Sequence, residues 1–190
     1  MTDEEMDGLL VRAGQGDNDA LHLLYTAWRS AVFYFALAIT GNYHDAQDIL
    51  QDTFIRLKHA GYHSENAKAY VFAIARNLAL TCLRERKRVE PAAPVEKAVR
   101  RGAGMEETTE LDEALSRLPP DERQIVLLHV LGGLKHRETA ALLRIPLGTA
   151  LWKYQRALAK LRRWLKERGL SDEQTGAASV HPKKSGTVHT

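Results

Sequence analysis

One predicted helix near the C-terminus concentrates positive charge. Residues 147–170 carry seven basic side chains and a single acidic one, Glu167. Cations at this density neutralise the phosphates of a nucleic acid, although a basic helix face is also a common solvated surface. The pattern therefore favours a polyanionic partner for this end of the chain. The basic residues are Lys153, Arg156, Lys160, Arg162, Arg163, Lys166 and Arg168.

A second segment, residues 61–88, mixes aromatic rings with cations and amides. Ring faces stack on unpaired bases while cations hold phosphates, a combination suited to single-stranded nucleic acid. Its polar loop at 61–66 is the kind of segment that receives a base displaced from the stack. Phe72 is interpreted as core, and for Arg76 and Asn77 the core and binding interpretations stay equally open. The candidate binding residues are Tyr62, His63, Asn66, Lys68, Tyr70, Arg76, Asn77, Arg84 and Lys87.

The segment at 43–60 carries an acidic stripe at helical spacing. Residues 1–60 as a whole hold nine acidic and four basic side chains, the opposite balance to the C-terminal helix. Such stripes are usually only solvated surface, but this one lies beside a strongly apolar bundle, which favours a basic protein partner. The residues proposed to contact that partner are Asp45, Asp48, Gln51, Asp52 and Arg56.

The residue types of an enzyme or a metal centre are missing from the sequence pattern. Cys82 is the only cysteine and lies in an apolar helical stretch, which favours an inert thiol. His59 and His63 are four residues apart, but no third ligand is near them. No Glu-x-x-His pair or nucleophile motif occurs, so we expect a non-enzymatic protein with no metal and no cofactor.

Helical periodicity accounts for nearly every patterned segment, and no alternation typical of a strand persists. Helices are predicted at 3–13, 19–39, 43–60, 67–88, 109–118, 120–130, 136–143 and 147–168. Gly14 and Gly16 end the first, and Asp17 or Asn18 caps the second. The predicted fold is all-α, with two small helical domains, an N-terminal bundle and a C-terminal helix-turn-helix domain, joined by a flexible linker.

Residues 135–168 have the layout of a helix-turn-helix. Thr139, Ala140, Leu142 and Leu143 are predicted to point inward from its first helix, and Ile145 to fill the space before the second. Pro146 cannot continue a helix, while Gly148 and Thr149 can start the next one. On the long second helix we expect Leu158, Leu161 and Leu165 to mark the packed face.

In such a unit the second helix enters the major groove, where its N-terminal residues approach base edges and flanking cations meet phosphates. A plain helical hairpin whose basic face meets only water remains the alternative. The candidate duplex-binding residues are Arg137, Thr149, Trp152, Lys153, Arg156 and Lys160.

Composition shifts divide the chain into a domain at 1–90, a linker at 91–108, a domain at 109–170 and a tail at 171–190. The linker begins with Pro91 and Pro94 and holds few large apolar residues, and the tail is small and polar. No apolar run approaches the roughly 18 residues needed to cross a bilayer. The acidic start lacks the layout of a signal peptide, so a cytoplasmic protein without membrane insertion is expected.

Four stretches in order resemble the small sigma factors of the extracytoplasmic-function (ECF) group of the sigma-70 family, over roughly residues 5–168. They are Gly16 to Tyr25, Gly41 to Phe54, Glu65 to Ala79, and Leu118 to Leu128 continued by Gly148 to Arg162. The second is similar to the acidic helix that docks on the polymerase β′ coiled coil. The third resembles the segment that binds and melts the −10 element, and the fourth the domain that reads the −35 element.

The resemblance implies a sigma factor that binds core RNA polymerase through the β′ coiled coil and β flap. It also implies promoter DNA as a partner and an anti-sigma factor, either membrane-linked or soluble, that occupies these surfaces until a signal arrives. Two rivals remain at this point. A stand-alone helix-turn-helix regulator would need duplex DNA alone and no acidic helix, whereas an adaptor mimicking a sigma factor would not need Arg76, Asn77 or the basic helix.

This chain departs from the family pattern at three places, one of which is the basic run 135–137 in place of a typically less basic stretch. Tyr70 stands where members commonly have tryptophan, which keeps an aromatic ring. After Gly148 and Thr149, the usual valine-lysine-serine-arginine is replaced by residues 150–153, Ala-Leu-Trp-Lys. Because lysine cannot copy the arginine fork on guanine, we expect either an unusual −35 sequence or contacts made more through phosphates and DNA shape.

Overall fold

The structure, a computed structural model, describes residues 2–59, 66–89 and 110–168. The expected linker at 91–108, the expected tail at 171–190 and the candidate residues Tyr62 and His63 lie outside the described residues. Within the described ranges the regular elements are helical, as the sequence predicts.

The first half of the chain forms a bundle of α1 (Asp3–Gly14), α2 (Asn18–Thr40), α3 (Tyr43–His59) and α4 (Ala67–Val89). Local chemistry sets the ends of α2. The Asp17 carboxylate accepts the Asp19 and Ala20 amides at 3.0 Å, and Gly41 adopts the left-handed φ of 66° that ends the helix. The sequence-based helix limits agree with these bounds to within one or two residues.

The bundle core is built from the face of α2 that the periodicity predicts. Leu24, Trp28, Val32 and Phe35 are all buried, and Leu21 packs at the margin. The Phe72 ring from α4 meets the Phe35 ring edge-on, with centroids 5.6 Å apart, and is fully buried. The interpretation of Phe72 as a core residue is confirmed.

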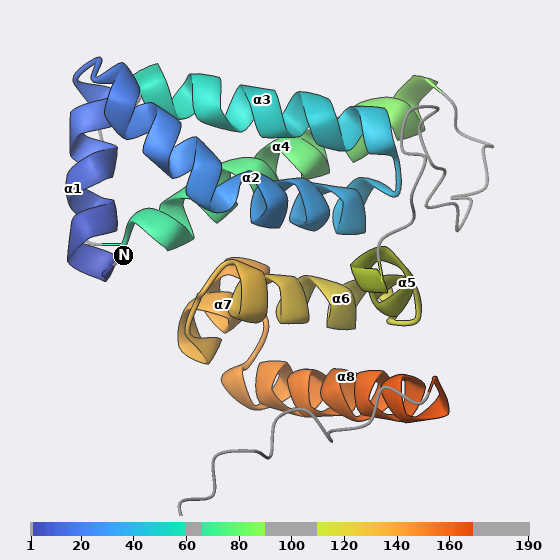
Figure 1. The fold of residues 1–190 in the computed structure, drawn as a ribbon. Coiled ribbons are helices and arrows are strands. Elements are labelled where there is room, and N and C mark those ends of the chain that lie inside the picture. Colours follow the sequence, from blue (N-terminus) through green and yellow to red (C-terminus); the bar gives the residue numbers. More distant parts are fainter. Residues whose placement is uncertain (1, 60–65, 90–109, 169–190) are drawn as a thin grey trace, which may run out of the picture.

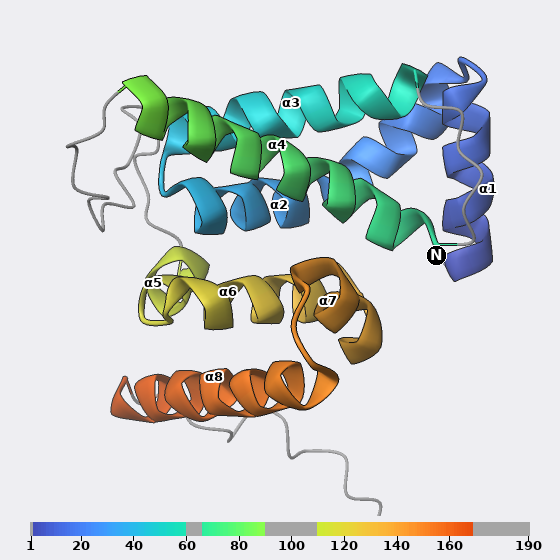
Figure 2. The ribbon, with the colours of Figure 1, turned by 180° about the vertical axis from the view of Figure 1, so that it is seen from behind.

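The second half consists of α5 (Glu110–Ser116), α6 (Pro120–Val126), the π-helical turn η1 (Leu127–Leu131), α7 (His136–Leu143) and α8 (Leu147–Glu167). Figures 1 and 2 show α6 and α7 lying between the bundle and α8. Sequence periodicity predicts one helix over 120–130. In the structure α6 is followed by the wider π-helical turn η1. This widening accompanies the burial of the neighbours Leu127 and Leu128 in two different hydrophobic clusters.

The packed face of α8 differs from the predicted one. Leu165 is 37% exposed, so the prediction that it faces the core is wrong, while Leu158 and Leu161 are half-buried. The fully packed positions are Ala150, Ala157 and Trp164, which lie seven residues apart. Small residues allow α8 to approach its neighbours closely at two of these positions, a preference that a search for leucines misses.

One described helix, α2, is long and apolar enough to cross a membrane by length and hydropathy alone. The expectation that no such segment exists is therefore wrong on those two criteria. Half of the apolar window is buried, and α2 packs against α1, α3 and α4. A helix at the centre of a bundle passes the same test, because its neighbours bury much of its circumference.

Truncation of Phe72 to alanine is expected to lower the free energy of unfolding by about 3–5 kcal/mol, because it leaves a cavity against Phe35. Urea denaturation followed by circular dichroism measures the loss. Leu23→Ala is the matched control, since Leu23 is 48% exposed and its truncation should change stability by less than about 1 kcal/mol. Equal losses for the two variants would contradict the packing described here.

Candidate nucleic-acid interface

The described nucleic-acid-binding candidates of the first half lie on α4 or, for Asn66, directly before its first residue. Asn66, Tyr70, Asn77 and Arg84 are spaced by four, seven and seven residues and so share one helix face. Arg76 and Lys87 lie on an adjacent face, whereas Lys68 lies on the side turned toward α1, where it pairs with Asp3. Asn77, Arg84 and Lys87 are exposed, whereas the other four described candidates are half-buried.

Two carboxylates of α1 hold the N-terminal end of α4. The Ala67 amide donates to Asp7 Oδ1 at 2.6 Å, and the Lys68 ammonium donates to Asp3 Oδ1 at 2.6 Å. The hydrogen bond from Lys68 lowers the pKa of Asp3. The Asp7 carboxylate therefore lies where the amides and dipole of a helix N-terminus attract an anion.

Asn66 has two roles at the same place. Its Oδ1 accepts the Ala69 amide at 2.9 Å and caps α4, while its Nδ2 donates to Glu138 Oε1 of α7 at 2.8 Å. A candidate residue of the first half of the chain is therefore bonded to the helix-turn-helix unit. Asp3, Asp7, Lys68, Lys135 and Glu138 line a polar cavity of about 110 Å³ around it.

The acidic stripe of α3 faces solvent. Asp48, Gln51, Asp52 and Arg56 are exposed, while Asp45 is half-buried and pairs with Arg86 of α4 at 3.6 Å. Asp48 and Asp52 have no ion-pair partner within residues 2–59, 66–89 and 110–168. Ile55 is 56% exposed on the same helix, which adds an apolar contact point close to the charged stripe.

The turn between α7 and α8 follows the predicted chemistry. Arg144 ends α7 in the left-handed conformation with φ of 57°, and Pro146 occupies the cap position before Leu147. Thr139 and Ala140 are buried, and Leu142, Leu143 and Ile145 are half-buried. The unit therefore has the helix-turn-helix geometry that the sequence predicts.

The first cations of α8 are paired with acidic residues of α6. Lys153 bonds to Asp121, Arg156 lies 3.3 Å from Glu122, and Lys160 donates to Glu122 at 2.8 Å. The Glu122 side chain is only 4% exposed, so its charge is balanced chiefly by Arg156 and Lys160. The hydrogen bond from Lys153 lowers the pKa of Asp121.

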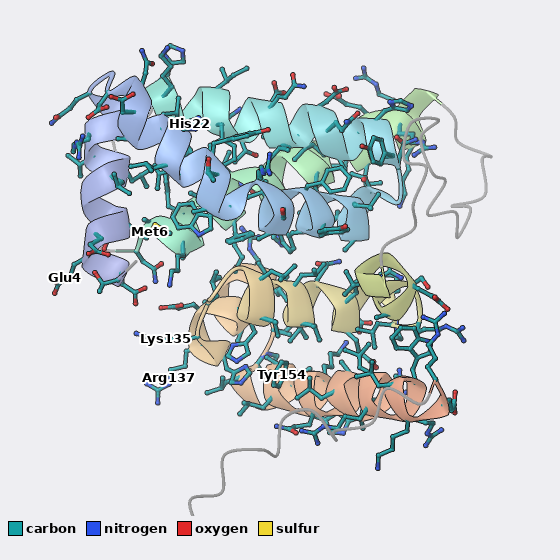
Figure 3. All side chains as sticks on the ribbon, viewed as in Figure 1. Glu4, Met6, His22, Lys135, Arg137 and Tyr154 are labelled. Atoms are coloured by element: carbon teal, nitrogen blue, oxygen red, sulfur yellow. The ribbon has the colours of Figure 1, made fainter. Side chains whose placement is uncertain are left out.

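Trp152 presents the largest exposed ring on α8. It is 57% exposed, and the Arg156 guanidinium lies 5.1 Å from the centroid of its ring. Thr149 is half-buried and Arg137 is exposed at the start of α7, where Figure 3 shows it directed away from the protein. Of the six duplex-binding candidates, Lys153, Arg156 and Lys160 thus pair with carboxylates of α6.

The sequence reasoning missed three features of this region. Asp121 and Glu122 were not singled out, because their roles depend on partners more than 30 residues away. Gln155 is a further exposed polar residue on α8. It lies three residues after Trp152, so the two are neighbours on the helix surface, and this spacing could have identified it as a candidate. The third is a cluster of two histidines and a tyrosine.

This aromatic cluster joins η1, α7 and α8. The His129 and His136 rings stack with centroids 4.0 Å apart, and Tyr154 meets both edge-on at 4.8 Å. His129 Nδ1 lies 2.7 Å from the Leu134 carbonyl oxygen. Burial, with a smaller contribution from the charge of His129, lowers the pKa of His136. The folded state therefore favours the neutral form of His136.

Acidification is expected to destabilise the fold through His136. Below the ordinary pKa of 6.5 the unfolded chain binds a proton that folded His136 resists, so this part of the stability falls as the pH drops from 6.5 toward the lowered value. Urea denaturation at several pH values measures it. His136→Phe keeps a ring in the stack and should flatten this part of the profile, whereas His22→Gln, at an exposed site, should not. Identical profiles for all three proteins would contradict the assignment to His136.

In the described part of the chain, no three histidine, cysteine, aspartate or glutamate side chains are grouped so as to hold a metal ion. Cys82 of α4 is half-buried, and burial together with the nearby Asp45 raises its pKa to about 11. Its thiol is therefore protonated near neutral pH, in agreement with the interpretation as an inert residue.

Two family models match the chain in separate segments. Residues 24–89 match "Sigma-70 region 2" and residues 108–161 match "Sigma-70, region 4". The first range contains α3 and α4, which carry the acidic stripe and the aromatic-cationic surface. The second contains α6, α7 and most of α8.

Curated relatives cover most of the chain. The ECF RNA polymerase sigma factor SigE of Mycolicibacterium smegmatis is 30% identical over 177 residues, which are 85% of this chain and 69% of the relative. The ECF RNA polymerase sigma factor EcfG of Rhodopseudomonas palustris is 32% identical over 147 residues, 73% of this chain and 81% of the relative. SigM of Bacillus subtilis is 28% identical, covering 79% and 97% respectively.

Solved structures resemble the fold as well. The sigma factor RpoE in complex with the anti-sigma factor NepR from Bartonella quintana has a TM-score of 0.59 and 25% identity, covering 76% of this chain and 96% of that one. CnrH in complex with the cytosolic domain of CnrY has a TM-score of 0.55 and 23% identity, covering 85% and 97%. The likeness to CnrH concerns the fold alone.

Proposed function

The chain belongs to the ECF group of sigma-70 family RNA polymerase sigma factors, non-enzymatic proteins that direct the polymerase to promoters, and from this premise we propose how its surfaces divide that work. One polymerase-docking surface and two DNA-reading surfaces act in one chain. The observation that carries this division is the separation of charge: exposed Asp48 and Asp52 on α3, without an ion-pair partner in the described ranges, and cations on α4 and α8. The proposed functional units are two domains at 1–90 and 109–170, a linker at 91–108 and a tail at 171–190.

The α3 stripe docks on a basic surface of core polymerase, the β′ coiled coil. Asp48 and Asp52 are exposed and carry no internal ion pair in the described ranges, so their charges are available to a partner. Complementary charges guide the encounter and set its orientation. Asp45, Gln51 and Arg56 extend the surface to either side, and the β flap is the proposed second contact, reached by the α5–α8 unit.

The α4 surface binds and holds open the −10 element. Tyr70 offers a ring face to an unpaired base, and Asn77, Arg84 and Lys87 are exposed for base and phosphate contacts. Asn66, Lys68 and Arg76 join them at the N-terminal half of the helix. Tyr62 and His63 complete the proposed set from outside the described residues.

The α8 surface reads the −35 element as duplex DNA. Trp152 meets apolar base edges such as the thymine methyl group, and Gln155 is placed to form two hydrogen bonds with an adenine. Arg137, Thr149, Lys153, Arg156 and Lys160 supply the remaining contacts. Lys153, Arg156 and Lys160 reach phosphates only after their ion pairs with Asp121 and Glu122 break.

An anti-sigma factor is the proposed regulator of these surfaces. The solved structure of the similar RpoE from Bartonella quintana contains the anti-sigma factor NepR, which supports the idea for this chain. Because the partner polymerase is cytoplasmic, the chain acts there, and an anti-sigma factor anchored in the membrane would hold it at the inner surface.

Run-off transcription with purified core polymerase and a library of promoter fragments tests the function. The expected result is transcript from a subset of fragments that share −35 and −10 sequences, together with co-purification of the chain with core polymerase. If no fragment is transcribed and core polymerase does not co-purify, the chain does not act as a sigma factor. Binding to duplex DNA without polymerase would then favour a stand-alone helix-turn-helix regulator.

A further inference from the structure

The first turns of α8 present apolar side chains to solvent. Leu147, Leu151 and Trp152 are 36%, 38% and 57% exposed. Leu147 and Leu151 lie four residues apart and Trp152 is the next residue, so the three lie on one side of the helix. We call these three residues the apolar tip of α8. Because exposed apolar side chains that are grouped mark a contact surface, the apolar tip indicates a partner.

Packing of α8 inside the protein does not account for the apolar tip. The packed positions Ala150, Ala157 and Trp164 lie on a different side of the helix. Tyr154, two residues after the tip, points toward α7 and meets the His136 ring (Figure 3). The apolar tip is therefore available to a molecule other than the chain segments that the structure describes.

Few hydrogen-bonding side chains accompany the apolar tip. Within 147–155 the exposed side chain with an amide group is Gln155, one turn further along the same side. Thr149 is half-buried, and Lys153 is half-buried and bonded to Asp121 of α6. The part of α8 that approaches base edges in a helix-turn-helix thus offers mainly apolar contact area.

Cations flank the apolar tip along the protein surface. Arg162, Arg163 and Lys166 are exposed and continue the same side of α8 toward its C-terminal end. Arg144, just before α8, and Arg137, at the start of α7, are exposed as well. Such cations neutralise the phosphates that border a groove, whereas an apolar protein surface would leave them without counter-charge. Charge complementarity therefore assigns the apolar tip to duplex DNA.

The major groove of DNA offers one apolar group to such a surface, the C5 methyl group of thymine. Burial of one carbon of this size against leucine or tryptophan raises affinity about fourfold. A cytosine at the same place would instead press its amino donor against apolar side chains, without an acceptor. The same A·T pairs expose adenine N6 and N7, which the amide of Gln155 is able to bond.

We propose that this chain selects its −35 element chiefly by thymine methyl groups, which the apolar tip of α8 buries in the major groove, next to an adenine bonded by Gln155. The inference rests on the function proposed above, since it names the sequence class that the α8 surface reads. Hydrophobic contact with methyl groups, and not the number of cations, sets the sequence preference. The flanking cations hold the phosphates and fix the orientation of the helix.

Removal of single methyl groups from the DNA tests the proposal. Enrichment of a random duplex library by the full chain, alone and in complex with core polymerase, first gives the preferred sequence, which we expect to contain thymines beside an adenine. Deoxyuridine in place of one such thymidine removes the methyl group and keeps every hydrogen-bonding group, so the affinity should fall about fourfold at each contacted position. A preferred sequence without thymine, or changes below twofold at every thymine, would overturn the proposal.

A double-mutant cycle connects the methyl groups to the apolar tip. In Leu151→Ser and Trp152→Ser the effect of deoxyuridine should shrink below twofold at one thymine each, because that methyl group no longer has an apolar partner. Val130→Ser is the matched control, since Val130 is 56% exposed on η1, outside α8, and it should keep the fourfold effect. Circular dichroism checks that each variant is folded.

Two results of this cycle count against the proposal. If Leu151→Ser and Trp152→Ser keep the full effect at every thymine, the apolar tip does not contact the methyl groups. If they also bind core polymerase more weakly than the wild-type chain, the apolar tip is a protein contact and the inference is overturned.

Salt dependence and transcription complete the test. The ratio of thymine to deoxyuridine affinities should stay constant between about 50 and 200 mM salt, because burial of a methyl group releases no counterions. A ratio that falls with salt would assign the effect to phosphate contacts and overturn the proposal. Run-off transcription that ignores deoxyuridine in the −35 element would overturn this inference alone. Methyl-dependent duplex binding without transcription would overturn the sigma function and leave the inference standing.

Discussion

Replacement of Asp48 and Asp52 by lysine is expected to weaken binding to core RNA polymerase about 100-fold or more, because opposed like charges at an interface cost several kcal/mol. Run-off transcription should fall to background in parallel. Both side chains are exposed on α3 and take part in no ion pair of the described structure. Their replacement therefore removes an intermolecular interaction and leaves the internal ones intact.

Two measurements are needed to read this result. Fluorescence anisotropy with core polymerase gives the affinity, and thermal denaturation shows that the variant is folded. Glu4→Lys with Asp19→Lys is the charge-matched control, since both residues are exposed at the starts of α1 and α2. Equal affinity of the Asp48/Asp52 variant and the wild-type protein would remove the proposed role of α3.

Neutralising Asp121 and Glu122 is expected to strengthen binding to −35 duplex DNA about tenfold at about 0.1 M salt. Asp121→Asn with Glu122→Gln removes two negative charges next to Lys153, Arg156 and Lys160 while preserving side-chain size. The freed cations can neutralise further phosphates, so the slope of log affinity against log salt should steepen by roughly two. A search that counts only cations would not predict this increase.

The salt series provides the measurement and its control. Anisotropy titrations between about 50 and 200 mM salt give both affinity and slope. Glu113→Gln is the comparison, because Glu113 pairs with Arg117 and Arg168, away from the start of α8. Unchanged or weaker binding by the double variant would mean that the paired cations do not contact DNA.

Recognition of the helices needed only local information. The acceptor at Asp17, the glycine at 41 and the proline at 146 act on amides and dihedral angles within a few residues, so the ends of α1 to α4, α7 and α8 were predictable. Local pattern failed where packing decided the outcome. Leu165 is exposed because Trp164 occupies the buried position beside it, and residues 127–131 widen where Leu127 and Leu128 enter different cores.

The family motifs and the charge separation were likewise visible in the sequence, because exposed charges on a helix require no partner to be recognised. The sequence did not show which of those charged or polar groups are bound by other residues of the chain. Lys153 and Lys160 are bound by residues 32 and 38 positions away, and Asn66 by a residue 72 positions away. Such pairs form only when helices pack, and packing depends on the fit of whole faces. The sequence therefore determined which surfaces exist, whereas the tertiary structure decided which are occupied from within.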